Sequence, residues 1–325
     1  MIAEQFPPFR PHPLLASGHM QTLAGVLLPG PRLVYSARQH RLPLGDGDVI
    51  VLHDDCPPDW QAGGRTALLI HGLAGCHQSG YMQRVAAKLS ARGVRCFRMD
   101  LRGCGAGFGL ARLPYHSGRS EDAAAALDEI ARLAPGSPTM LVGFSLGGNI
   151  ALKLAGELAG RGCGNLDGVV AVCPPVDLAA AVERLRRLQN RLYDRHFVKL
   201  LMTQLRQRCQ ALGDSPTVDF VQPPKRLWEF DEFFTAPVCG FGTAGNYYRL
   251  CSSAQFVPRI RLPTLIIASR DDPLVPSQTL QALPSNPAVR LHLASHGGHL
   301  GFVGRLGHDA DRRWLDWRIV EHIAR

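Results

Sequence analysis

Ser145 is the residue whose surroundings most clearly indicate chemistry. It is the centre of a Gly-x-Ser-x-Gly pattern, Gly143 to Gly147, which follows an apolar run (residues 139–144) and precedes a segment rich in small residues (146–159). Between a strand and a helix, this pattern holds the serine on a tight turn that exposes its hydroxyl, and the glycines leave room for the crowded backbone. The sequence therefore predicts Ser145 as the nucleophile of an acyl-transfer reaction.

A serine hydroxyl needs a general base, and the base needs a carboxylate to orient it. On a strand–elbow–helix framework the acid and then the histidine follow the serine along the chain. The acid is Asp271 or Asp272, which come after an apolar run (residues 264–269) and Arg270. For the base, His299 is favoured over His296, because the glycine pair before it lets the loop approach Ser145. We expect His296 to be a hydrogen-bonded loop residue.

The oxyanion of the reaction also needs donors, usually the amide after the nucleophile and one from the loop after an early strand. Leu146 follows Ser145 directly and supplies the first amide. His71-Gly-Leu73-Ala-Gly75 follows the first apolar run of the predicted sheet and supplies the Leu73 amide as the second. We expect His71 to brace this loop rather than to transfer protons.

Short apolar runs that alternate with amphipathic segments predict the elements that position these residues. The pattern is typical of a mostly parallel sheet with crossover helices. Strands are expected at residues 67–70, 94–99, 139–144, 168–173, 264–269 and 289–293, and helices at 80–92, 120–133, 146–159, 277–283 and 309–324. Residues 40–53 predict an antiparallel hairpin at one edge. Between residues 177 and 263 the alternation stops, which indicates an insertion. We expect this insertion to form a lid.

Composition limits the class of protein. The chain has 325 residues, of which 46% are hydrophobic and 19% charged, so a folded globular protein is expected. No apolar run reaches the roughly 18–20 residues of a membrane span, and residues 1–13 lack the features of a secretory signal, so a cytoplasmic location is expected. The nine cysteines contain no Cys-x-x-Cys pair. We predict free thiols and neither a metal nor a cofactor.

The net charge of +9 raises the question of an anionic partner. Much of the excess lies in residues 183–208, where basic residues alternate with Leu185, Leu188, Leu192 and Leu200. This spacing favours amphipathic helices with a solvated basic face. The charge alone does not identify a partner. Peripheral contact with anionic lipid is an open alternative, and no nucleic acid is expected.

With these pieces together, the chain resembles an α/β-hydrolase of the YheT-like subgroup, which includes eukaryotic abhydrolase-domain lipases and ester synthases. The resemblance spans nearly the whole chain. It rests on Phe6-Pro-Pro-Phe9, Gly18-His-x-Gln-Thr22, His71-Gly-Leu-x-Gly75, Gly143-Phe-Ser-Leu-Gly-Gly-Asn149, Phe234-Thr-Ala-Pro237 with Tyr247-Tyr248, and His296-Gly-Gly-His-Leu-Gly-Phe302.

The resemblance implies the α/β-hydrolase fold as a single domain over residues 1–325, with an N-terminal extension (1–40) and a helical lid insertion (about 178–262). It favours Asp272 over Asp271 as the acid, because of the Pro-Leu-Val-Pro turn that follows. It implies a serine hydrolase acting on small-molecule carboxylic esters with short- to medium-chain acyl groups.

Three alternatives stay open. An acyltransferase or alcohol ester synthase, or a phospholipid acyl hydrolase, would use the same triad, and a non-catalytic member of the fold is the third. The oligomeric state is not predicted. Five aromatic residues either line an apolar pocket or belong to the core: Phe144, Phe230, Phe233, Phe234 and Tyr247.

Overall fold

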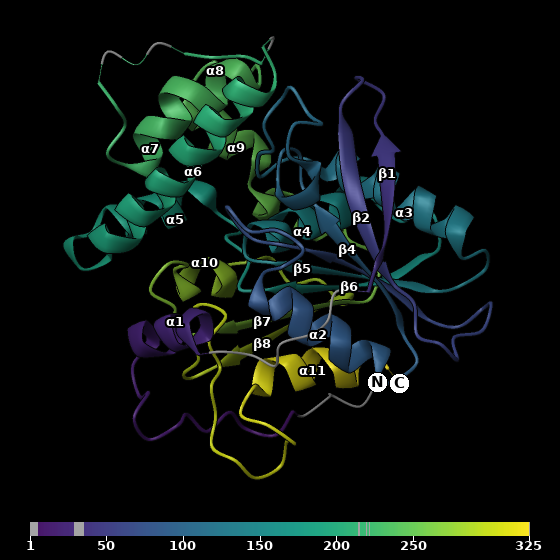
Figure 1. Cartoon of the computed structure of the whole chain (residues 1–325). Helices are drawn as coiled ribbons and strands as arrows, with labels where there is room; N and C mark the ends of the chain where they lie inside the picture. Colours follow the sequence, from purple (N-terminus) through teal and green to yellow (C-terminus); the bar gives the residue numbers. More distant parts are fainter. Residues whose placement is uncertain (1–5, 29–35, 214, 219, 221, 325) are drawn as a thin grey trace.

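The strands of the chain form one twisted sheet, seen edge-on in the centre of Figure 1. The computed structural model describes residues 6–28, 36–213, 215–218, 220 and 222–324. Within this part, the sheet has eight strands in the order β1-β2-β4-β3-β5-β6-β7-β8. Their bounds are β1 Arg38–Pro43, β2 Val49–Asp55, β3 Thr66–Ile70, β4 Arg95–Asp100, β5 Thr139–Phe144, β6 Leu166–Val172, β7 Thr264–Ser269 and β8 Val289–Ala294.

The predicted mostly parallel sheet is confirmed. β3 to β8 run parallel to one another, whereas β1 pairs antiparallel with β2, and β2 pairs antiparallel with β4. Every residue of β3, β5 and β7 is buried, because helices cover both faces of the sheet. The predicted hairpin is confirmed as β1 and β2, with β1 at the edge.

Helices cover the two faces in separate layers. One face packs against α2 (Gly80–Ser90) and α11 (Trp314–Ile323), and the other against α3 (Ser120–Leu133) and α4 (Leu146–Leu158). The short helix α10 (Ser277–Gln281) follows β7. The prediction of a helix from residue 309 was wrong at its start, because the Asp311 carboxylate accepts hydrogen bonds from the Arg313 amide and the Trp317 indole and holds a turn there.

Between β6 and β7 the chain leaves the sheet and forms a group of helices, coloured green in Figure 1. This insertion contains α5 (Leu178–Arg186), α6 (Arg191–Ala211), α7 (Leu227–Phe230), a π-helical turn (Asp231–Thr235), α8 (Ala236–Val238) and α9 (Ala244–Cys251). The predicted insertion boundaries of 178–262 include residues 214, 219 and 221, which lie outside the described residues.

The amphipathic pattern predicted for residues 183–208 is only partly correct. Leu185 is buried, but Leu188 and Leu192 are 84% and 79% exposed. Arg208 is only 8% exposed, although the pattern placed it on the solvated face. The reason is the break between α5 and α6 at residues 187–190, which changes the face that each later residue presents to the core.

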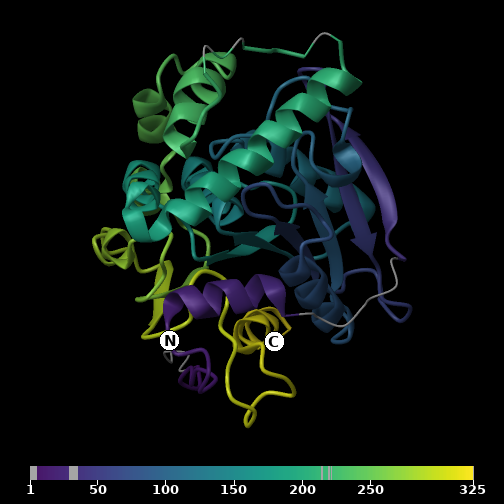
Figure 2. The same cartoon turned by 60° about the vertical axis from the view of Figure 1, so that its left-hand side comes forward.

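The N-terminal segment contains a helix that the sequence analysis did not predict, α1 (Gly18–Leu27). It lies between the green insertion and α11, as Figure 2 shows in purple. Ser17 caps it by accepting a hydrogen bond from the Met20 amide. The predicted extension of residues 1–40 includes 1–5 and 29–35, which lie outside the described residues. In the described part of the chain, no helix combines the length and apolarity needed to cross a bilayer.

Candidate active site

Ser145 occupies a strained turn between β5 and α4. Its φ of 52° lies in the left-handed region, which is unfavourable for a residue with a side chain. A Cβ on Gly143 would lie 2.1 Å from the Gly147 carbonyl oxygen, and one on Gly147 would lie 2.4 Å from the Ile70 carbonyl oxygen. The two glycines are therefore required for the backbone to cross itself so closely and to expose the hydroxyl.

The predicted acid and base lie at the carboxyl ends of β7 and β8, next to this turn. The His299 Nε2 atom is 2.9 Å from Ser145 Oγ, and its Nδ1 atom is 2.8 Å from Asp272 Oδ2. With Nδ1–H donating to the carboxylate, Nε2 is left to accept the hydroxyl proton. The other oxygen of Asp272 accepts from the amides of Leu274 and Val275, at 2.8 and 3.0 Å, which fixes the carboxylate.

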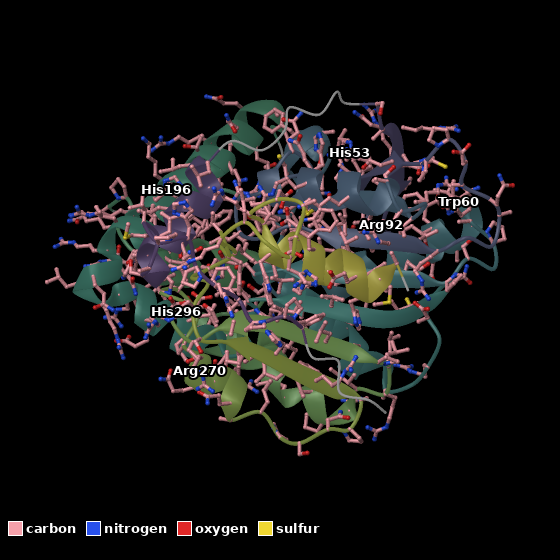
Figure 3. The ribbon with its side chains drawn as sticks, turned by 90° about the horizontal axis from the view of Figure 1, so that it is seen from below. His53, Trp60, Arg92, His196, Arg270 and His296 are labelled. Carbon is pink, nitrogen blue, oxygen red and sulfur yellow. The ribbon has the colours of Figure 1, made fainter. Side chains whose placement is uncertain are left out.

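Asp271, the alternative acid, points elsewhere. Its Oδ1 accepts a hydrogen bond from the Gly298 amide at 2.9 Å, so it holds the loop before His299. His296 Nδ1 lies 3.4 Å from Asp271 Oδ2, and the imidazole is about half exposed. Seen from below, His296 lies at the same end of the molecule as His196 of α6, opposite Trp60 (Figure 3). Neither Asp271 nor His296 contacts Ser145 by a hydrogen bond in the described part of the chain.

Helix α1 fixes the histidine loop from outside the sheet. Thr22 Oγ1 accepts a hydrogen bond from the His299 amide at 2.9 Å and donates to the Gly18 carbonyl at 2.7 Å. The side-chain amide of Gln21 donates to the Val303 carbonyl and accepts from the Val303 amide. Sequence reasoning assigned no role to these residues. The Gly-His-x-Gln-Thr pattern was the available signal, but the contact joins residues 277 positions apart.

The two amides predicted for the oxyanion are free to donate. Leu146 is the first residue of α4, where the amide has no intrahelical acceptor. Among the described residues, neither the Leu146 nor the Leu73 amide has a hydrogen-bond acceptor. Both residues line the cavity that contains Ser145 and His299. The geometry therefore permits both amides to donate to an oxygen held beside Ser145.

His71 braces the loop that carries Leu73. Its Nδ1 is 2.8 Å from the Gly72 carbonyl oxygen, and its Nε2 accepts a hydrogen bond from the Leu101 amide at 3.2 Å. Burial lowers the pKa of His71, which favours the neutral ring that this donor–acceptor pattern requires. The next amides are also occupied, since Gly72 and Ala74 donate to the hydroxyls of Tyr81 and Tyr115. These contacts leave the Leu73 amide as the donor of the loop.

A cavity of about 90 Å³ opens onto Ser145 and His299. Its walls are mainly apolar and come from the insertion and from the loop after β7: Leu178, Ala181, Val182, Leu185, Phe197, Leu227, Leu274 and Val275. Of the five aromatic residues considered above, Tyr247 lines this cavity and Phe230 and Phe234 line an adjoining one. Phe144 is fully buried in the core at the end of β5, and Phe233 is 49% exposed, and neither lines these two cavities.

Asp231 is a polar residue of the cavity that sequence reasoning missed. It begins the π-helical turn of the insertion, and its carboxylate accepts a hydrogen bond from the Tyr248 hydroxyl at 2.8 Å. Burial raises the pKa of Asp231 to about 7, and hydrogen bonds from Tyr248 and Thr235 offset only part of this effect. A single acidic residue in an aromatic, proline-containing segment offered no pattern by which to identify it.

Other parts of the described chain gather polar groups without a nucleophile–base pair. His53 and His77 both hydrogen bond to Asp100, at 2.9 and 2.7 Å, and their rings stack at 3.5 Å. Burial acts to raise the pKa of Asp100, but these hydrogen bonds outweigh it and lower the pKa. Although the spacing of these three residues would allow a metal ion, mutual hydrogen bonds account for the cluster.

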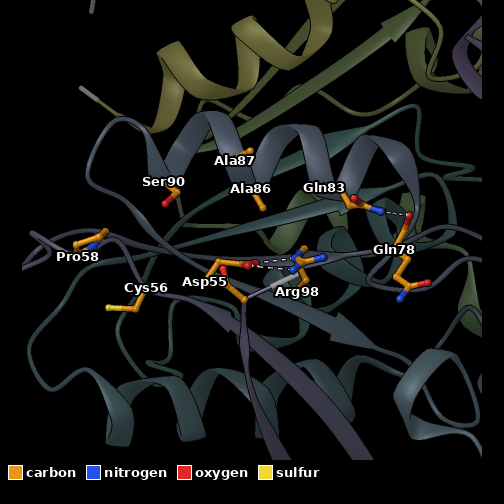
Figure 4. Close-up of a pocket in the computed structure, with 10 residues that line it drawn as sticks. Asp55, Cys56, Pro58, Gln78, Gln83, Ala86, Ala87, Ser90 and Arg98 are labelled. Atoms are coloured by element: carbon orange, nitrogen blue, oxygen red, sulfur yellow. Dashed lines mark hydrogen bonds and ion pairs between the residues drawn. The ribbon is translucent and has the colours of Figure 1, made fainter. Parts of the chain in front are cut away.

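A cavity of about 380 Å³ beside α2 is larger than the cavity at Ser145 but is not the candidate site. Figure 4 shows its lining residues, among which the Arg98 guanidinium makes two hydrogen bonds to the Asp55 carboxylate, at 2.6 and 2.9 Å. It shares no lining residue with the cavity at Ser145. We place the candidate active site by its chemistry rather than by volume.

Comparison with known proteins agrees with this geometry. Residues 67–305 match the protein family described as alpha/beta hydrolase fold. The Escherichia coli (strain K12) protein named "Putative esterase YheT" is 33% identical over 94% of this chain and 90% of its own length. "Phospholipase ABHD3" of Mus musculus is 27% identical over a match that covers 73% of this chain and 58% of that protein.

Among solved structures, the Pyrococcus furiosus esterase PF2001 superposes with a TM-score of 0.57 at 15% identity, covering 98% of this chain and 97% of that one. At this identity the likeness shows the fold alone. Together with the family match over most of the chain, it gives the assignment: the chain belongs to the alpha/beta hydrolase fold family, and to its YheT-like subgroup.

Proposed function

We propose that this protein is a serine hydrolase that cleaves carboxylic esters through an acyl-enzyme on Ser145. The observation that carries the proposal is the continuous hydrogen-bond chain from Ser145 Oγ through His299 to Asp272. Membership of a family whose relatives include proteins named as esterases and phospholipases supports it.

The mechanism follows from these contacts. His299 Nε2 takes the Ser145 hydroxyl proton as Oγ bonds to the ester carbonyl carbon, and the carbonyl oxygen becomes the oxyanion. The amides of Leu73 and Leu146 donate to it, each worth about 2.7–4 kcal/mol in the transition state. The oxyanion then re-forms the carbonyl, the bond from the carbonyl carbon to the alcohol oxygen breaks, and His299 gives its proton to the leaving alcohol, which leaves the acyl group on Ser145. Water repeats the sequence to release the acid, while Asp272 remains ionised and stabilises the imidazolium.

The apolar cavity supports a substrate with a short- to medium-chain acyl group. Val182 and Leu185 of α5 and Phe197 of α6 line it, so an acyl chain would lie against the insertion. We propose that residues 178–262 act as a lid on a single-domain enzyme. The N-terminal extension would act as a support for the histidine loop, since Thr22 binds the His299 amide.

We also propose that the protein makes peripheral contact with anionic lipid. Val26 and Leu27 of α1 are 81% and 73% exposed, and Leu188 and Leu192 lie beside exposed arginines on the insertion. The His19 and Tyr193 rings stack at 5.7 Å, which joins α1 to α6. Apolar side chains beside basic ones suit the surface of a negatively charged bilayer.

The experiment that tests the esterase proposal measures hydrolysis of 4-nitrophenyl esters with acyl chains of two to twelve carbons. We expect the highest kcat/KM at short to medium chains and loss of activity in Ser145→Ala. Ser90→Ala, at a half-buried position on α2 that does not line the cavity at Ser145, serves as the matched control and should retain wild-type rates. Ester formation from an added alcohol in preference to acid release would instead identify an acyltransferase.

A further inference from the structure

A buried cation lies beside the candidate active site, and the structure records no ion pair for it among the described residues. Arg208 of α6 is only 8% exposed, and its Nε and Nη2 atoms are buried with no hydrogen-bond partner among the described residues. Its guanidinium carbon lies 5.3 Å from the centre of the Phe234 ring. Burial of a charge without acceptors is costly, so this geometry favours a ligand that brings acceptors to it.

The cavity around Arg208 adjoins the cavity of Ser145. Leu73, Leu146, Asp231 and Tyr247 line both of them, so the two cavities meet at the amides assigned to the oxyanion. The Arg208 cavity has a volume of about 50 Å³. One water molecule needs about 10–15 Å³ of such space, so the cavity has room for one small polar group.

The other basic groups of this cavity are already balanced or neutral. Arg102 pairs with Asp46, Asp48 and Asp122 at 2.6–2.8 Å. His116 Nδ1 accepts a hydrogen bond from the Gly118 amide, which places the proton of the neutral ring on Nε2. Burial and the nearby arginines and lysine lower the pKa of His116 well below its usual value.

Asp231 does not serve as the counter-ion of Arg208. Its carboxylate accepts from the Tyr248 hydroxyl, and no ion pair joins it to Arg208 within the described residues. Among the described residues, the Nε and Nη2 atoms of Arg208 are thus left without an acceptor, and the carboxylates of Asp46, Asp48 and Asp122 make their ion pairs with Arg102.

We propose that the Arg208 cavity is an anion subsite, which binds a carboxylate or phosphate group of the substrate while the ester carbonyl faces the Leu73 and Leu146 amides. This inference rests on the proposed esterase function and narrows its substrates to anionic esters. The guanidinium fork matches two oxygens of a carboxylate or phosphate. The anion is either on the acyl side, as in a dicarboxylic acid monoester, or on the alcohol side, as in the acyl ester of a phosphorylated alcohol.

Two substrate pairs distinguish these sources. The acyl-side pair is 4-nitrophenyl butyrate and mono(4-nitrophenyl) glutarate, and the alcohol-side pair is 1-butyrylglycerol and 1-butyrylglycerol 3-phosphate. For each pair, the measured quantity is the ratio of kcat/KM for the anionic ester to that for the neutral ester. Arg208→Gln is compared with Arg206→Gln, which removes an exposed charge from the same helix.

In one pair, we expect Arg208→Gln to lower this ratio about 10- to 100-fold, the size expected for a buried charge-assisted hydrogen bond. Arg206→Gln should leave the ratio at the wild-type value, and Arg208→Lys should restore part of it. If Arg208→Gln fails to fold, the same ratio of kcat/KM values is compared between Arg208→Lys and Arg206→Lys. A lower ratio in Arg208→Lys then supports the proposal. Ratios that are equal in wild type and the Arg208 variants for both pairs would overturn the proposal.

A binding measurement separates this failure from failure of the esterase proposal. Calorimetric titration of glutarate and of glycerol 3-phosphate into Ser145→Ala needs no catalysis. Saturable binding that Arg208→Gln weakens at least 10-fold supports the subsite even if no ester is cleaved. Absence of binding by both probes, with neutral esters still cleaved, rejects the subsite and leaves the esterase intact.

Discussion

The assignment of Asp272 rather than Asp271 to His299 gives the most discriminating substitution pair. Asparagine at position 272 still offers one oxygen to the amides of Leu274 and Val275, so the turn is kept. The group that faces His299 Nδ1, 2.8 Å away, becomes an NH₂ donor. Two donors cannot share that contact, so the ring turns to the tautomer that carries its proton on Nε2 and cannot accept the Ser145 proton.

We expect Asp272→Asn to lower kcat about 10⁴-fold, which corresponds to about 5 kcal/mol of transition-state stabilisation. Asp271→Asn keeps an oxygen for the Gly298 amide and loses only the exposed 3.4 Å contact to His296. Such an exposed pair is worth about 1 kcal/mol or less, so kcat should fall less than about fivefold.

The assay is steady-state hydrolysis of 4-nitrophenyl butyrate by both variants and wild type, with circular dichroism to check that each is folded. The reasoning is refuted if Asp271→Asn is the more damaging change in a folded protein. It is also refuted if Asp272→Asn retains more than about a tenth of the wild-type kcat.

Three further outcomes are expected. A methyl group in Gly147→Ala meets a backbone oxygen of β3 at 2.4 Å, so the unfolding free energy should fall by about 1–3 kcal/mol. In Gly213→Ala the added methyl meets no atom of the described residues within 4 Å, so the unfolding free energy should change little. Equal melting temperatures of the two variants would contradict this. Because the folded-state pKa of Asp231, about 7, exceeds the usual 3.8, the stability it contributes is present below pH 4 and lost as the pH rises to 7, at about 1.4 kcal/mol per unit. Urea unfolding of Asp231→Asn should therefore show a flatter pH profile, and an unchanged profile would be evidence against burial as the cause. Thr22→Val removes the acceptor of the His299 amide and should lower kcat about tenfold with KM unchanged; loss of stability alone would indicate a merely structural role.

The lipid proposal has its own test. Val26→Asp places a charge on the exposed face of α1, where the wild-type side chain is 81% exposed and contributes little to the core. We expect reduced co-sedimentation with vesicles of phosphatidylserine and phosphatidylcholine, and no change with phosphatidylcholine alone. Equal sedimentation of wild type and Val26→Asp would contradict the proposed contact. Asp59→Asn, at an exposed position in the loop between β2 and β3, serves as a charge-changing control.

Much of the fold could be predicted because its signals are local. The run of residues 139–144 is apolar at every position but one, and it forms β5 with those bounds. The hairpin, the parallel strands and most helix starts depend on runs and breakers a few residues long. The positions of Ser145, Asp272 and His299 at strand ends follow from the same reasoning, because parallel strands bring their carboxyl ends to one edge.

What could not be predicted depends on distant contacts. Helix α1 has no strong apolar periodicity, and it is stabilised by contacts with the histidine loop almost 280 residues later. Arg208 reads as one of several solvated arginines, and only the change of direction between α5 and α6 turns it inward. The burial that shifts Asp231 comes from elements on both sides of the cavity, which no window of sequence contains.

The central claim is that Ser145 is an activated nucleophile, and covalent labelling by a fluorophosphonate tests it most directly. Intact-mass measurement should show one label per chain in wild type, none in Ser145→Ala, and much slower labelling in His299→Ala. Folded wild-type protein that stays unlabelled, or a label that persists in Ser145→Ala, would contradict the account.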